Sequence, residues 1–247
     1  MKWLWLPVLS AVLIAPALGA EVKVLSGGAV EPGLEAAVEA YRKESGQDVK
    51  IQYATAPMIR QKITAGEAAD VVIAPPAIAD ELAKAGKLDA SSSVSLGRVG
   101  IGVAVRNGVP KPDIANSEAV TRAVLDSEAV VFNRASSGIY LERMFERLGI
   151  AEQVKAKETR YPDTNAVMAH MVKGTKKEIT LAPITELLLY KDKGLDFIGP
   201  LPNDIQNYTG YVAVVTAAPA NREGAAALLK YFGTAGSKKL FAERGVE

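Results

Sequence analysis

The chain has 247 residues, no cysteine, one histidine, and 29 basic against 28 acidic residues. A balanced charge, with no basic stripe interleaved with aromatic residues, argues against a nucleic-acid-binding protein. The lack of cysteine excludes a disulfide framework and a lipid-attachment cysteine, and with a single histidine it argues against a zinc or copper site.

The N-terminal segment is predicted to be a secretory signal peptide. Lys2 is followed by an apolar run over residues 3–15, a proline and small residues, which is the order typical of such signals. The run is shorter than the roughly 20 residues that a membrane-spanning helix needs, although an uncleaved anchor is the alternative. We predict that residues 1–20 are removed, with cleavage after Gly19 or Ala20. Because Lys2 is the one charged residue in this segment, the exported, periplasmic protein then carries 28 basic and 28 acidic residues.

Strand and helix patterns alternate along the rest of the chain. In chain order they predict strand 21–26 with helix 33–46, strand 49–54 with helix 58–66, strand 69–74 with helix 75–86, strand 99–105, strand 129–133 with helix 137–149, strand 157–161 with helix 163–174, strand 178–182 with helix 183–194, strand 195–199, strand 208–215, and a helical tail over 221–245. This alternation predicts an α/β fold with mostly parallel sheets.

In such sheets a ligand binds at the carboxyl ends of the strands, where the next helices begin. Small or hydroxyl-bearing residues occupy four of these junctions: Ser26–Ala29, Thr55–Pro57, Ala135–Gly138 and Pro162–Asn165. A helix start offers free N–H groups and the positive end of the helix dipole, so it binds anions without a lysine. Taken singly, Ser137, Asp163 and Thr164 are better explained as ordinary N-caps. The four junctions together favour one shared anion-binding cleft.

Arg134 lies just before the helix start at Ser136 and Ser137, and its planar guanidinium suits a carboxylate or an oxyanion. The alternative is a surface arginine paired with a nearby glutamate. Arg60 and Arg160 are weaker candidates for the same role.

The motifs of common enzymes are absent from the sequence. There is no G-x-S-x-G, no phosphate-loop motif and no H-E-x-x-H, and the glycines over 97–102 lack dinucleotide-binding spacing. His170 lies within a predicted helix, which leaves a Ser137–His170 pair open. We predict a protein that is not an enzyme and that uses no cofactor or metal, with a secreted, hydrolase-like α/β enzyme for a small anionic substrate as the alternative.

Three phrases, "AGEAADVVIA" (65–74), "ASSGIYLERMFERLG" (135–149) and the closing "LFAERG" (240–245), resemble the periplasmic molybdate-binding proteins of ABC importers. The similarity runs over nearly all of the mature chain. It implies the type II periplasmic binding fold, in which crossover hinge strands join two α/β lobes. Lobe one would comprise residues 21–103 and 208–247, and lobe two residues 104–207.

The resemblance also implies which residues contact the solute. The family's oxyanion contacts fall on Ala29, Ala56 (with Thr55 beside it), Ser137, Thr164 and Ala182, so two of its serines and its tyrosine are alanine here. The ligand site is therefore divergent. Together with the residues of the strand ends, the predicted ligand-binding set is Ser26, Gly28, Ala29, Thr55, Ala56, Arg134, Ser136, Ser137, Thr164 and Ala182.

The function that follows is capture of a small anion between two hinged lobes and its delivery to an ABC transporter permease in the inner membrane. The protein is expected to act as a monomer. The solute is either a molybdate-like oxyanion or a small organic carboxylate that uses the space freed by Ala29 and Ala182.

Overall fold

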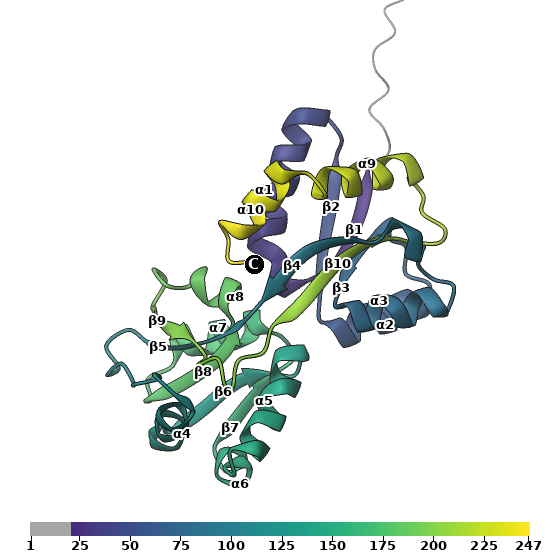
Figure 1. Cartoon of the computed structure of the whole chain (residues 1–247). Helices are drawn as coiled ribbons and strands as arrows, with labels where there is room; N and C mark the ends of the chain where they lie inside the picture. Colours follow the sequence, from purple (N-terminus) through teal and green to yellow (C-terminus); the bar gives the residue numbers. More distant parts are fainter. Residues whose placement is uncertain (1–20) are drawn as a thin grey trace, which may run out of the picture.

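The computed structural model describes residues 21–247, which form two five-stranded sheets, each covered by helices on both faces (Figure 1). The predicted signal peptide, residues 1–20, lies outside the described residues. Within 21–247, no helix has the length and apolar character needed to cross a bilayer.

The first sheet forms the centre of one of the two lobes. Its strands lie in the order β2 (Val49–Ala54), β1 (Val22–Gly27), β3 (Val71–Ala74), β10 (Thr209–Val215) and β4 (Val94–Val99). β1 is parallel to β2 and β3, and β10 is antiparallel to β3 and β4, so four of the five strands run in one direction.

Helices cover both faces of this sheet. One core cluster packs the first face against α1 (Glu31–Ser45), α9 (Arg222–Phe232) and α10 (Ala235–Ala242). A second cluster packs the other face against α2 (Ala56–Thr64) and α3 (Pro76–Lys84). Two short 3-10 turns, η1 (Gly28–Val30) and η2 (Ala90–Ser92), complete this part, which we call the first-sheet lobe.

The second sheet repeats the same arrangement. Its strands lie in the order β7 (Glu158–Tyr161), β6 (Ala129–Asn133), β8 (Glu178–Pro183), β5 (Ile101–Arg106) and β9 (Leu195–Pro200), and β5 is the one strand of reversed direction. One face packs on α4 (Ser117–Asp126), α5 (Ser136–Arg147) and α6 (Ala151–Lys155), and the other on α7 (Thr164–Lys173) and α8 (Ile184–Leu188). These elements form the second-sheet lobe. The predicted α/β fold with two lobes and mostly parallel sheets is confirmed.

Two chain segments cross between the lobes. The chain leaves the first sheet after Val99, enters the second at Ile101, and returns to the first at Thr209. The segments are tied together by Gln206, whose side chain accepts from the Ile101 N–H at 2.8 Å and donates to the Ile101 carbonyl at 2.9 Å. The lobe boundaries inferred from the resemblance, at 103/104 and 207/208, stay a prediction.

The predicted single strand over 99–105 is wrong, because it is divided at Gly100 between the two sheets. A Cβ at Gly100 would lie 3.1 Å from the Tyr208 ring and 3.3 Å from Ile184, so the absent side chain allows the crossing segments to pass closely. The apolar periodicity of the sequence does not indicate where a strand passes from one sheet to another.

Other predicted elements also differ in extent. The helix predicted over 183–194 ends at Leu188, and the chain continues as turns to Gly194, whose φ of +107° lies outside the right-handed helical region. The helical tail is two helices, because Thr234 begins a new one by accepting a hydrogen bond from the Ser237 N–H. β4, α4 and α6 were not predicted.

Candidate functional site

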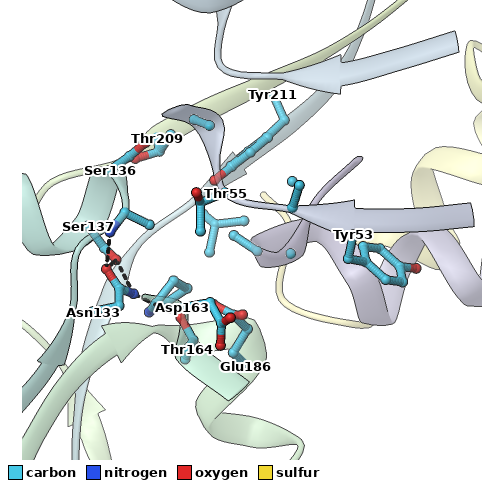
Figure 2. Close-up of a pocket in the computed structure, with 18 of the residues that line it drawn as sticks. Tyr53, Thr55, Asn133, Ser136, Ser137, Asp163, Thr164, Glu186, Thr209 and Tyr211 are labelled. Atoms are coloured by element: carbon cyan, nitrogen blue, oxygen red, sulfur yellow. Dashed lines mark hydrogen bonds between the residues drawn. The ribbon is translucent and has the colours of Figure 1, made fainter. Parts of the chain in front are cut away.

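A cleft lies between the two lobes, at the carboxyl ends of β1, β2, β6 and β7 and beside the crossing segments (Figure 2). Its volume is about 120 Å³. A cavity needs roughly 10–15 Å³ to hold one water molecule, so the cleft has room for a small solute and not for a polymer. The wall is formed by Gly27, Gly28, Ala29, Tyr53, Ala54, Thr55, Ala56, Met58, Val99, Gly100, Ile101, Asn133, Ala135, Ser136, Ser137, Asp163, Thr164, Asn165, Pro183, Glu186, Thr209 and Tyr211.

The structure brings seven of the ten predicted ligand-binding residues to this wall. From the first-sheet lobe come Gly28, Ala29, Thr55 and Ala56, and from the second-sheet lobe come Ser136, Ser137 and Thr164. They are distant in sequence and meet because they follow strands whose carboxyl ends face the same gap.

The other three predicted residues lie elsewhere. Ser26 is fully buried inside β1, where its hydroxyl donates to the Gly27 carbonyl. Ala182 is buried in β8, opposite Gly102 of β5, so it frees no space in the cleft. Arg134 is exposed and does not line the cleft, although its backbone N–H donates to the Tyr161 carbonyl at 2.8 Å. Its contact with the solute stays a prediction.

Among residues 21–247, no lysine, arginine or histidine lines the cleft. Arg60 makes a 3.6 Å surface ion pair with Glu81. Arg160 pairs with Glu142 and lies over the Phe132 ring, 4.9 Å from its centroid. The wall therefore supplies polar groups and helix dipoles in place of cationic side chains.

Helix starts from both lobes face the cleft. The N-cap residues of α2 and α5, Thr55 and Ala135, make no side-chain capping hydrogen bond within the described chain. α7 is capped by Asp163, whose carboxylate accepts from the Ala166 N–H at 2.9 Å. In α5 the Asn133 amide oxygen accepts from the Gly138 N–H, so the Ser136 and Ser137 N–H groups are the ones left without a side-chain cap in the described chain. The starts of α2 and α5 place the positive ends of two helix dipoles on opposite sides of the cleft.

Asn133, the last residue of β6, organises the second-sheet side of the cleft. Its amide nitrogen donates to the hydroxyls of Ser137 (3.0 Å) and Thr164 (2.9 Å). Its amide oxygen accepts from the N–H groups of Ala135 (2.9 Å) and Gly138 (3.2 Å). A Cβ at Gly138 would lie 1.8 Å from the Asn133 carbonyl oxygen, so only glycine allows α5 to begin this close to β6. The network holds the Ser137 and Thr164 hydroxyls against Asn133 on the cleft wall (Figure 2).

The short helix α8 reaches across to the first-sheet lobe. The Thr185 hydroxyl donates to the Ala29 carbonyl at 2.6 Å. A Cβ at Gly28 would lie 3.2 Å from Oε1 of Glu186, so a side chain there would crowd this carboxyl. The glycine at this junction allows Glu186 to lie in the cleft between the lobes.

Glu186 is 7% exposed, and it has no cationic neighbour on the cleft wall as the structure describes it. Burial raises the pKa of Glu186 to about 8, and the nearby carboxylates of Glu31 and Asp163 add to the rise. A hydrogen bond from the Thr164 hydroxyl acts in the opposite direction. At neutral pH the carboxyl is therefore largely protonated and able to donate a hydrogen bond.

Tyr211 of β10 lies on the first-sheet side, with its hydroxyl directed toward Thr55 (Figure 2). Its ring packs against Gly27, where a Cβ would lie 3.0 Å away. Burial and the proximity of Glu186 raise its pKa, which keeps the hydroxyl neutral. Tyr53 points its hydroxyl away, toward Glu35 at 2.8 Å.

The structure does not pair Ser137 with His170. His170 contacts the Tyr161 hydroxyl at 2.8 Å through Nδ1 and Glu178 at 3.1 Å through Nε2, outside the cleft wall. Within residues 21–247, no group of three or more His, Cys, Asp or Glu side chains is arranged to hold a metal ion.

Asn133, Glu186 and Tyr211 are among the wall residues that the sequence analysis did not single out. Asn133 ends a buried strand and Glu186 interrupts an otherwise apolar run, and a polar residue in such a place is a signal that was available. Tyr211 gives no comparable signal, because alternating strands commonly contain tyrosine.

The family described as "Bacterial extracellular solute-binding protein" matches residues 22–247. A curated relative, an aconitate isomerase of Pseudomonas sp., is 30% identical over 253 aligned positions, which cover 97% of this chain and 94% of the relative.

Solved structures share the fold at lower identity. The periplasmic molybdate-binding protein of Azotobacter vinelandii superposes with a TM-score of 0.77 at 14% identity, over 92% of this chain and 98% of that one. The sulfate-binding protein SubI of Mycobacterium tuberculosis H37Rv gives 0.72 at 17% identity, over 91% and 85%. These likenesses concern the fold.

Proposed function

The chain belongs to the bacterial extracellular solute-binding proteins, and from that membership we propose that it is the periplasmic receptor of an ABC importer for a small organic acid with two or more carboxylates. It acts as a monomer that captures the acid between its lobes and delivers it to the permease. Closure around the solute is the event that the transporter recognises.

The observation that carries this proposal is the pair of helix starts, α2 and α5, that face the cleft from opposite lobes and whose own N-cap side chains make no capping bond. Each favours negative charge near it. A solute with a carboxylate at either end satisfies both, and Ala29 and Ala56 leave it more room than the serines of the resembled family would. The aconitate isomerase relative, similar over nearly its whole length, points to the same chemical class.

The donors on the wall suffice for a useful affinity. A micromolar Kd requires about 8 kcal/mol of binding free energy. Hydrogen bonds to a charged group contribute roughly 1.5–3 kcal/mol each, so three or four donors reach this value without a metal or a cationic side chain. Thr55, Ser136, Tyr211 and the first-turn N–H groups are candidates for these donors.

Native mass spectrometry of the mature protein tests the proposal. Incubated with an equimolar mixture of citrate, aconitate, sulfate and molybdate, the protein is expected to retain one polycarboxylate per chain. Retention of molybdate or sulfate in its place would reject an organic acid as the solute.

A second candidate function is isomerisation of such an acid, favoured by the relative's name and by Glu186. Isomerisation by proton transfer needs a group that takes a proton and returns it, with a pKa near the working pH. Glu186 meets that requirement, whereas Ser137 and His170, the parts of a hydrolase, lie apart. Proton NMR of aconitate in D2O, with the protein added, tests this function. Turnover with deuterium uptake that is lost in Glu186→Gln and kept in His170→Ala would support it. An unchanged spectrum would reject it.

A further inference from the structure

Binding of an anion does not by itself explain why the carboxyl of Glu186 lies on the cleft wall. It is more than nine-tenths buried, it lies on the wall, and Oε1 comes within 3.2 Å of where a Gly28 Cβ would be, on the opposite lobe. An ionised carboxylate in this nearly buried position would face the negative charge of a captured anion. Such a like-charge contact is strongly unfavourable, because burial removes most of the solvent screening of the carboxylate.

The neighbours of Glu186 make its ionised form still less favourable. It faces Glu31 from α1, Asp163 from the start of α7, and the neutral Tyr211 from β10. No basic side chain within 21–247 lines the cleft to compensate. In the neutral form the same carboxyl offers an O–H donor where the wall otherwise has hydroxyls and backbone amides.

We infer, building on the receptor function proposed above, that Glu186 binds the solute in its protonated form and donates a hydrogen bond to an anionic oxygen, so that the protein captures its solute together with one proton. The raised pKa of the free carboxyl means that at neutral pH the proton is already in place. Above that pKa, binding must take a proton from solution.

Calorimetric titration of the mature protein with aconitate, from pH 7 to pH 10, tests the inference. The carboxyls of the free probe stay ionised in this range, because ordinary carboxyl pKa values lie near 4. Tyr211 also stays neutral, because its pKa is raised. The Kd is expected to rise about tenfold per pH unit above pH 8, and about 90-fold in total. Titrations in buffers of different ionisation enthalpy should show proton uptake near zero at pH 7 and approaching one at pH 10.

Glu186→Gln is the matched variant, since its amide still donates a hydrogen bond but does not titrate. Its Kd should stay constant from pH 7 to pH 10, because the amide does not titrate. Glu31→Gln is the control and should keep the pH dependence. If Glu186→Gln does not fold, the wild-type series decides alone.

A constant wild-type Kd without proton uptake, or a Kd that falls with pH, would overturn the inference and leave the receptor function standing. Absence of binding by aconitate and citrate at pH 7 would instead reject the proposed solute class. The same pH series with molybdate would then test Glu186 separately, with the same two outcomes.

Discussion

Replacing Asn133 by alanine tests how the second-sheet side of the cleft is built. The side chain is 1% exposed, and it bonds the hydroxyls of Ser137 and Thr164 and the N–H groups of Ala135 and Gly138. In Asn133→Ala these four groups lose their hydrogen bonds to the Asn133 side chain in a buried environment. A net loss of about 1 kcal/mol per hydrogen bond predicts destabilisation by about 3–5 kcal/mol.

Urea denaturation followed by circular dichroism measures this loss. Asn165→Ala is the matched control, because Asn165 also lines the cleft but is exposed and bonds no other side chain in the described structure. We expect the control to change the free energy of unfolding by less than about 0.5 kcal/mol. A loss below about 1 kcal/mol in Asn133→Ala would refute the idea that this residue organises the site.

Three further predictions concern other parts of the chain. Because the Arg134 side chain is exposed, Arg134→Ala should weaken solute binding by less than about 1 kcal/mol, and this loss should decrease with added salt. A loss of affinity that persists in salt would instead indicate that Arg134 contacts the solute. Burial raises the pKa of Glu186 from 4.5 to about 8, so folding favours the protonated carboxyl. The free energy of unfolding of the free protein should therefore fall as the pH rises from 4.5 to about 8. At about 1.4 kcal/mol per pH unit, the loss is at most roughly 5 kcal/mol. Thermal melts from pH 5 to pH 9 should show this fall in wild type and not in Glu186→Gln; equal slopes would contradict it. N-terminal sequencing of the periplasmic protein should begin at Ala20 or Glu21, and an intact leader on membrane-bound protein would contradict the signal peptide.

The sequence was sufficient to predict the α/β alternation, because most of the strands are short apolar or alternating runs and most of the helices carry an apolar stripe. Junction residues such as Thr55, Ser136 and Thr164 were also found, since the carboxyl ends of parallel strands share one edge of a sheet. These predictions depend on local patterns and on general rules of topology.

The remaining features depend on tertiary contacts. Gly100 divides one apolar run between two sheets, and nothing local marks the change. Arg134 follows its strand as closely as Ser136 does, yet its side chain is exposed, since a loop residue's direction is set by its neighbours in space. Glu186 reaches the cleft because α8 crosses to the other lobe, and spacing along the chain does not report such a crossing.

We expect a polycarboxylate to be captured in the cleft by groups from both lobes. It is tested by calorimetric titration with aconitate and with molybdate, comparing wild type with Thr55→Val on one lobe and Ser136→Ala on the other. We predict one aconitate bound per chain, preferred over molybdate, with affinity reduced in both variants. Tighter binding of molybdate, or aconitate binding that neither variant alters, would contradict this expectation.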